Sequence, residues 1–155
     1  MNFRLSPLLR DRFDPLFSMS DDALARHGAR RLTATKHPGF PCRVSLQDAQ
    51  VGEEVLLVNF EHLPVDTPFR SNYAVYVRVG AQQAHPTVNE VPEMLRTRAL
   101  SLRGWTPDGM LAGADMAEGT DLERVIAEMF SIPEVGFIHV HFAKQGCYAV
   151  RVDQV

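Results

Sequence analysis

The stretch GFIHVHFAKQGCYAVRV, residues 136–152, decides how the C-terminal part of the chain folds. Two apolar runs flank a short polar segment that contains Gly146, a pattern that predicts a β-hairpin. A two-residue loop at Lys144-Gln145 would set Ile138 opposite Arg151 and mix apolar and charged partners on one face. A three-residue loop ending at Gly146 instead gives one apolar face, and glycine suits the left-handed position of such a loop. The pairs that it predicts are Phe142 with Tyr148, Val140 with Val150, and Ile138 with Val152.

The other face of this hairpin is polar and is the first candidate site. It is expected to carry His139, His141, Cys147, Ala149 and Arg151, with His139 directly opposite Arg151. Two histidines two residues apart lie about 6.6 Å apart along a strand, from a rise of ~3.3 Å per residue. Such a pair can chelate a metal, and Cys147 lies within diagonal reach.

Three interpretations of this face stay open: a metal site, the lining of a binding pocket, and a polar face that only stabilises the sheet. Arg151 repels a cation, no carboxylate is placed nearby, and further ligands would have to come from His62 or Cys42. We therefore favour a hydrogen-bonding pocket with neutral histidines and expect no metal or cofactor. Arg151 favours the neutral form of His139, because a nearby like charge disfavours protonation.

The remaining pattern predicts an α+β fold with a single antiparallel sheet of about five to six strands. Residues 54–60, 72–80, 98–105 and 109–117 are expected to be strands, and residues 81–97 a loop with a helical turn. A short helix is expected at 19–28, with Ser20 as N-cap. A longer helix is expected at 120–131, where Thr120 and Glu123 form a capping box. Its apolar stripe is Leu122, Val125, Ile126, Met129 and Phe130.

The length of 155 residues favours one domain over residues 1–155. A net charge of −3 argues against nucleic acid or an anionic membrane surface as partner. The N-terminal residues lack the apolar core of a signal peptide, and no apolar run approaches the ~18 residues that span a bilayer. With two cysteines, these features predict a cytoplasmic protein with reduced thiols.

Two further stretches contain candidate residues. In KHPGFPCRVSL, residues 36–46, a rigid turn presents Cys42 beside Arg43, which would lower the pKa of a reactive thiol. A small buried cysteine at the start of a strand is the alternative. In EHLPVDTPFRSNY, residues 61–73, the polar residues His62, Arg70 and Ser71 suit a carboxylate or phosphate ligand. No nucleotide-binding loop, nucleophile elbow or zinc-protease motif is present.

Four runs of this sequence resemble a bacterial family, the domain of unknown function 1203. They are PGFPCRVSLQDAQVGEEVLLVNFEH, PFRSNYAVYVR, VPEMLRTRALSLRGW and IHVHFAKQGCYAVRV. The resemblance implies one complete small bacterial domain and leads us to expect Asn where this chain has Phe142. It brings no catalytic residues with it.

The sequence thus favours a domain that binds a small anionic molecule or a partner. Its expected ligand-binding residues are Arg43, His62, Arg70, Ser71, His139 and His141. The alternative is a small enzyme that uses a Cys42 thiolate, with His141 as a further catalytic candidate, or a metal bound by His139, His141 and Cys147.

Overall fold

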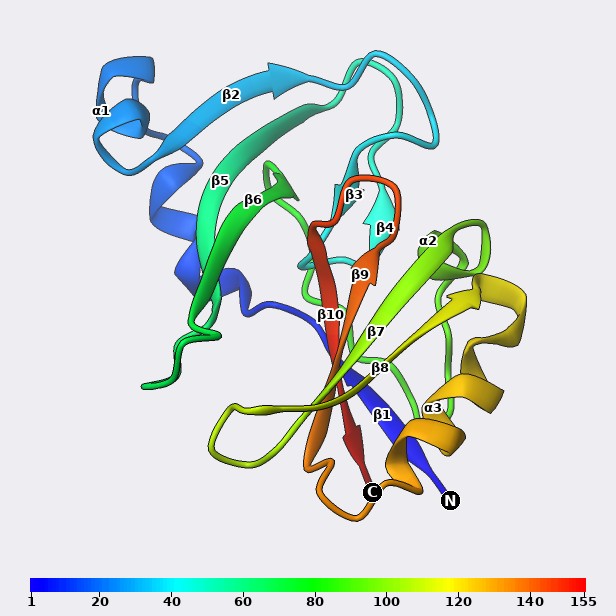
Figure 1. The fold of residues 1–155 in the computed structure, drawn as a ribbon. Helices are drawn as coiled ribbons and strands as arrows, with labels where there is room; N and C mark the ends of the chain where they lie inside the picture. The colour runs from blue at the N-terminus through cyan, green and yellow to red at the C-terminus, as the bar shows by residue number, and fades with distance from the viewer. The chain divides into compact units, whose positions relative to one another are not determined.

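The computed structural model describes residues 1–155 and has an α+β fold with two five-stranded sheets (Figure 1). In spatial order, the first sheet contains β1 (Phe3–Ser6), β10 (Tyr148–Gln154), β9 (Phe137–Phe142), β7 (Ala99–Trp105) and β8 (Leu111–Glu118). The second contains β2 (Ala29–Thr33), β5 (Glu54–Leu63), β6 (Ser71–Arg78), β3 (Pro41–Cys42) and β4 (Gln47–Asp48). The α-helices are α1 (Asp21–Arg26), α2 (Glu93–Arg96) and α3 (Leu122–Phe130). None of them has the length and apolar character needed to cross a membrane.

The chain divides into two compact units, each assembled from separate stretches. The first unit is Met1–Ser6, Glu61–Tyr73 and His85–Val155, and the second is Pro7–Phe60 and Ala74–Ala84. Strands β5 and β6 each run from one unit into the other. A single domain stays a prediction.

The prediction of a single antiparallel sheet is wrong. The expected strands at 54–60 and 72–80 lie in the second sheet, whereas the other expected strands lie in the first. Apolar alternation shows which face of a strand is buried but not which strands share a sheet. The second sheet is also mixed, because Cys42 of β3 pairs in parallel with Tyr76 of β6.

The hairpin of β9 and β10 has the predicted register along most of its length. Val140 lies opposite Val150, Ile138 opposite Val152, and His139 opposite Arg151. The predicted pair of Phe142 with Tyr148 is wrong, because Tyr148 lies opposite His141. The loop has four residues, closed by a hydrogen bond of 2.9 Å from Phe142 N to Cys147 O. A β-bulge between Tyr148 and Val150 takes up the extra residue and restores the register.

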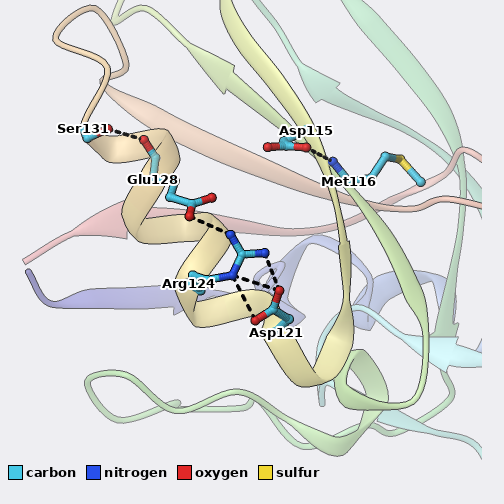
Figure 2. A network of polar contacts seen from close by, with 6 residues as sticks. All are labelled: Asp115, Met116, Asp121, Arg124, Glu128 and Ser131. Carbon is cyan, nitrogen blue, oxygen red and sulfur yellow. Dashed lines mark hydrogen bonds and ion pairs between the residues drawn. The ribbon is translucent and has the colours of Figure 1, made fainter.

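Helix α3 packs on β7, β8 and β9 of the first sheet. Four residues of the predicted stripe are buried: Leu122, Val125, Ile126 and Met129. The capping box is wrong: a 3-10 turn at Gly119–Asp121 precedes the helix, and Glu123 pairs with Arg96 of α2 instead. Figure 2 shows the exposed side of the helix, where Arg124 bridges Asp121 and Glu128.

The second unit has its own core around β2, β5 and β6. Helix α1 begins as predicted, with the Ser20 hydroxyl accepting a hydrogen bond of 3.2 Å from the Ala23 N–H. Gly28 follows the helix with a φ of 65°, the left-handed conformation that ends many helices. The core residues are Phe13, Leu16, Leu24, Ala29, Cys42, Val44, Leu56, Val58, Val77 and Ala81.

Replacing Ile126 by Ala should lower the free energy of unfolding by about 2–5 kcal/mol, the usual loss for a truncated core residue. Ile126 is fully buried in α3. The matched control is Glu128→Ala on the exposed side of the same helix, which removes a surface ion pair worth less than about 1 kcal/mol. Urea unfolding of both variants measures the difference, and equal losses would contradict the packing of α3.

Candidate functional site

Strand β9 carries the two histidines of the predicted polar face, and both are buried. His139 is 2% exposed and His141 is 1% exposed. The apolar residues of β9 lie on the opposite face of the sheet, because successive side chains of a strand alternate. The histidines therefore lie in the interior of the protein.

Residues of the segment 61–73 bury this face at one end. Leu63 of β5, with Val65 and Phe69 of the loop after it, packs against Trp105 of β7 and Phe137 of β9. The loop is also fastened to the turn between β7 and β8 by a 2.9 Å hydrogen bond from the Thr67 hydroxyl to Gly109 O. The same segment brings a third histidine to the site.

His62, near the end of β5, lies against the two histidines of β9. Its ring centroid is 5.8 Å from that of His139 and 5.3 Å from that of His141. One ring nitrogen from each of the three histidines lies within 4.8 Å of the others. We call these three residues the histidine cluster.

Tyr148 of β10 completes the packing around the cluster. Its ring stacks on His62 with centroids 5.1 Å apart and meets His139 edge-on at 5.0 Å. The bulge in β10 is what places Tyr148 opposite His141. The hairpin predicted from the sequence places Cys147 near this position. In the structure, Cys147 is not one of the residues whose ligand atoms converge.

The three histidines of the cluster differ in whether Nδ1 has a hydrogen-bond partner. His141 Nδ1 lies 3.0 Å from Gly146 O in the hairpin loop. A carbonyl oxygen only accepts, so Nδ1 of His141 carries a proton, and in the neutral ring the lone pair is on Nε2. Nδ1 of His62 and Nδ1 of His139 are buried without a hydrogen-bond partner.

Burial keeps two of these imidazoles neutral. Desolvation lowers the pKa of His139 to about 2, with smaller contributions from His62, His141, Arg151 and Arg103. Desolvation and the charge of Arg103 lower the pKa of His62 to about 4. The predicted effect of Arg151 on His139 is confirmed in direction, but burial is the larger cause. At neutral pH both rings have a nitrogen lone pair available for a metal or a hydrogen-bond donor.

Two arginines flank His139 on the same face of the sheet. Arg103 of β7 and Arg151 of β10 are its register partners on either side. Arg151 donates to both carboxylate oxygens of Asp153, at 2.7–3.0 Å, and its guanidinium lies 4.1 Å from the centroid of the Phe137 ring. Arg103 has no carboxylate partner.

The other predicted ligand-binding residues of this unit lie in the loop and at its end. Arg70 forms an ion pair with Glu61, and its side chain is 61% exposed. The Ser71 hydroxyl donates to Phe69 O at 2.5 Å. Both residues thus have partners within the segment 61–73. Their role in binding an anion stays a prediction.

Cys42 and Arg43 belong to the second unit, whereas the histidine cluster belongs to the first. Cys42 is fully buried, and its Sγ accepts hydrogen bonds from the N–H groups of Arg78 at 3.2 Å and Ser45 at 3.5 Å. Arg43 is 1% exposed and donates to Pro41 O at 2.6 Å. A thiol without exposed surface favours the packing role of Cys42 over the nucleophilic one.

The family model described as "Protein of unknown function (DUF1203)" matches residues 39–154. The chain belongs to this family. No curated protein and no solved structure matches the chain. The matched part of this DUF1203 chain includes the whole histidine cluster with Tyr148, Trp105, Arg103 and Arg151.

Sequence reasoning named His139 and His141 as a pair, and it named His62 both as a ligand-binding residue of the segment 61–73 and as a possible further metal ligand. It missed Tyr148, Trp105 and Arg103 as neighbours of the pair. Arg103 and Trp105 lie on β7 two residues apart, which places them on one face of that strand. That alternation was visible in the sequence, but the pairing of β7 with β9 was not.

The metal-free DUF1203 protein should lose stability as the pH falls from 7 to 5. In this window the unfolded chain protonates its histidines, which have an ordinary pKa near 6.5. His62, with a pKa of about 4, and His139, with a pKa of about 2, stay neutral when folded. Stability is therefore fully present above about pH 7 and falls as the pH falls toward the folded pKa values.

For His139 the expected loss between pH 7 and pH 5 is about 2 kcal/mol. Urea unfolding of EDTA-treated protein at the two pH values measures it. His139→Gln should reduce this dependence of stability on pH. The control His85→Gln, at an exposed loop residue, should keep the pH dependence of the wild type. Equal pH dependence in the two variants would contradict a buried neutral His139.

Proposed function

We propose that this DUF1203 chain binds a transition-metal ion through His62, His139 and His141. The observation that carries the proposal is the convergence of three ring nitrogens within 4.8 Å of one another in a buried part of the first unit. Zinc binds histidine nitrogen at about 2.0–2.1 Å, which places three ligands of one tetrahedral ion about 3.3 Å apart. Small movements of the side chains are enough to reach that spacing.

The protonation of the cluster supports the same function. A histidine ligand must be neutral, and burial holds the pKa of both His62 and His139 far below neutral pH. His141 donates through Nδ1 to the Gly146 carbonyl. A hydrogen bond of this kind fixes the tautomer of many metal-bound histidines and leaves Nε2 to face the ion.

The ligand set indicates the kind of metal. The group contains imidazoles and no carboxylate or thiolate. Imidazole suits zinc, copper, iron and nickel, whereas magnesium and calcium prefer oxygen ligands. Three protein ligands leave a fourth position for water or another molecule, as in catalytic zinc sites. Among the alternatives from the sequence, the proposal therefore adopts the metal site, with His62 as the third ligand in place of Cys147.

The competing interpretation is an aromatic cluster that only stabilises the fold. The stacking of Tyr148 on His62 supports it. Against it, Nδ1 of His62 and Nδ1 of His139 are buried and lack partners. An unsatisfied buried polar atom costs about 1–3 kcal/mol, and a purely structural cluster has no reason to keep two of them.

Metal analysis of purified protein tests the proposal. After EDTA treatment and dialysis against zinc, the protein should hold one zinc ion per chain with a Kd below about 1 μM, since structural and catalytic zinc sites are at least this tight. His139→Gln and His141→Gln should each weaken zinc binding by about 100-fold or more, because a direct ligand is lost. The matched control is His85→Gln, which lies outside the cluster and should bind as the wild type does.

Circular dichroism of each variant shows that the fold is kept. Two results would overturn the proposal: absence of tight, stoichiometric binding of zinc, copper, nickel and cobalt, or equal zinc affinity in the cluster variants and the control.

We also propose that the protein works in the bacterial cytoplasm without a nucleic-acid partner. The family resemblance supports the bacterial origin, and the two buried free cysteines suit a reducing compartment. The net charge of −3 supports the absence of a nucleic-acid partner. Oxidised Cys42 or Cys147 in freshly lysed cells, detected by alkylation and mass spectrometry, would contradict the location.

A further inference from the structure

Trp105 has a buried hydrogen-bond donor without an acceptor. Its side chain lies in β7, next to Phe69 and 6.2 Å from His139 between ring centroids. The residue is 3% exposed, and Nε1 has no hydrogen-bond partner. The indole N–H can only donate, so the group that satisfies it must be an acceptor.

Arg103 lies on the same face of β7 and also lacks a partner. It is the register partner of His139 on β9, and directly opposed residues have Cβ atoms about 4.5–5.5 Å apart. Arg151, on the other side of His139, is neutralised by Asp153. Arg103 has no carboxylate near enough for an ion pair. Its positive charge is therefore available to an anion.

The charge of the metal site adds to this argument. Three neutral imidazoles leave the full double charge of a divalent ion uncompensated, and the group contains no carboxylate to offset it. Arg103 adds a further positive charge beside the same histidine. An anionic group in the open coordination position would balance this charge and accept hydrogen bonds at the same time.

We propose that the site binds a small molecule with a carboxylate or phosphate group, which accepts hydrogen bonds from Arg103 and the Trp105 indole beside the metal. The part of this inference that concerns the metal rests on the proposed function. The donors differ from those expected from the sequence. Arg70 is paired with Glu61 and Ser71 donates to Phe69 O, so these two have partners already.

Trp105 is the only tryptophan of the chain, so its fluorescence reports on this site alone. Inorganic phosphate and acetate, each titrated into the zinc-loaded protein, serve as the two probes. We expect a saturable change in Trp105 fluorescence with at least one of them, and the better probe shows whether phosphate or carboxylate is preferred. Equilibrium dialysis with labelled probe gives the affinity independently of fluorescence.

Three variants separate the alternatives. Arg103→Gln and Trp105→Phe should each weaken anion binding by about 10-fold or more, because each removes a hydrogen bond to a charged group. Arg70→Gln tests the rival donor that the sequence predicts, and we expect it to bind the anion nearly as the wild type does. The matched control is Arg124→Gln on the exposed side of α3, whose arginine is already ion-paired. All four should bind zinc with unchanged stoichiometry, which shows that the cluster is intact.

The outcomes distinguish the two proposals. Zinc binding without any anion binding, or anion binding that is unaffected by Arg103→Gln and Trp105→Phe, overturns the inference and leaves the metal site standing. Loss of anion binding in Arg70→Gln alone also overturns it. If none of zinc, copper, nickel and cobalt binds, the proposed function fails. In that case, the anion is tested on the metal-free protein. Binding that Arg103→Gln weakens would uphold the anion site, and absence of binding would overturn the anion site as well.

Discussion

The burial of β9 on both faces is the constraint on which the first unit depends. All six residues of this strand are buried. Its apolar face, with Ile138, Val140 and Phe142, lies on the side of the sheet that α3 covers. Its other face holds His139 and His141 under the segment 61–73. Alternation along one strand therefore gives an apolar core on one side and an interior site on the other.

Burying two imidazoles together has a chemical consequence. A charged imidazole is costly in a desolvated site, and burial lowers the pKa of His139 and of His62. A neutral imidazole needs a donor or a metal for its lone pair, and His62 adds a third ring to the same place. The metal proposal accounts for the burial, the neutrality and the unpartnered nitrogens with one ion. The anion proposal accounts for the donors of Arg103 and Trp105, which the histidines alone leave unexplained.

Much of the local structure could be predicted from the sequence, because it depends on residues close in the chain. Ser20 caps α1, four of the five residues of the predicted stripe of α3 are buried, and the register from Ile138 to Val140 is as expected. The bulge at Tyr148 could not be predicted, because a four-residue loop with a bulge and a three-residue loop share the same register further along. The division into two sheets depends on pairings between distant strands, which local patterns do not contain. For the same reason, the chain could not show that His62 lies against a strand more than seventy residues away, or that Arg103 lies beside His139.

X-ray absorption at the zinc edge tests the central claim most directly, because it reports the atoms bound to the metal in solution. Protein loaded with one equivalent of zinc should show imidazole scattering from three histidines, with Zn–N distances of about 2.0–2.1 Å and a light atom in the remaining position. His62→Gln should reduce the number of imidazoles to two. A sulfur ligand at about 2.3 Å would assign the metal to a cysteine, and a spectrum unchanged by His62→Gln would show that the three histidines do not act together. Either result would contradict the account.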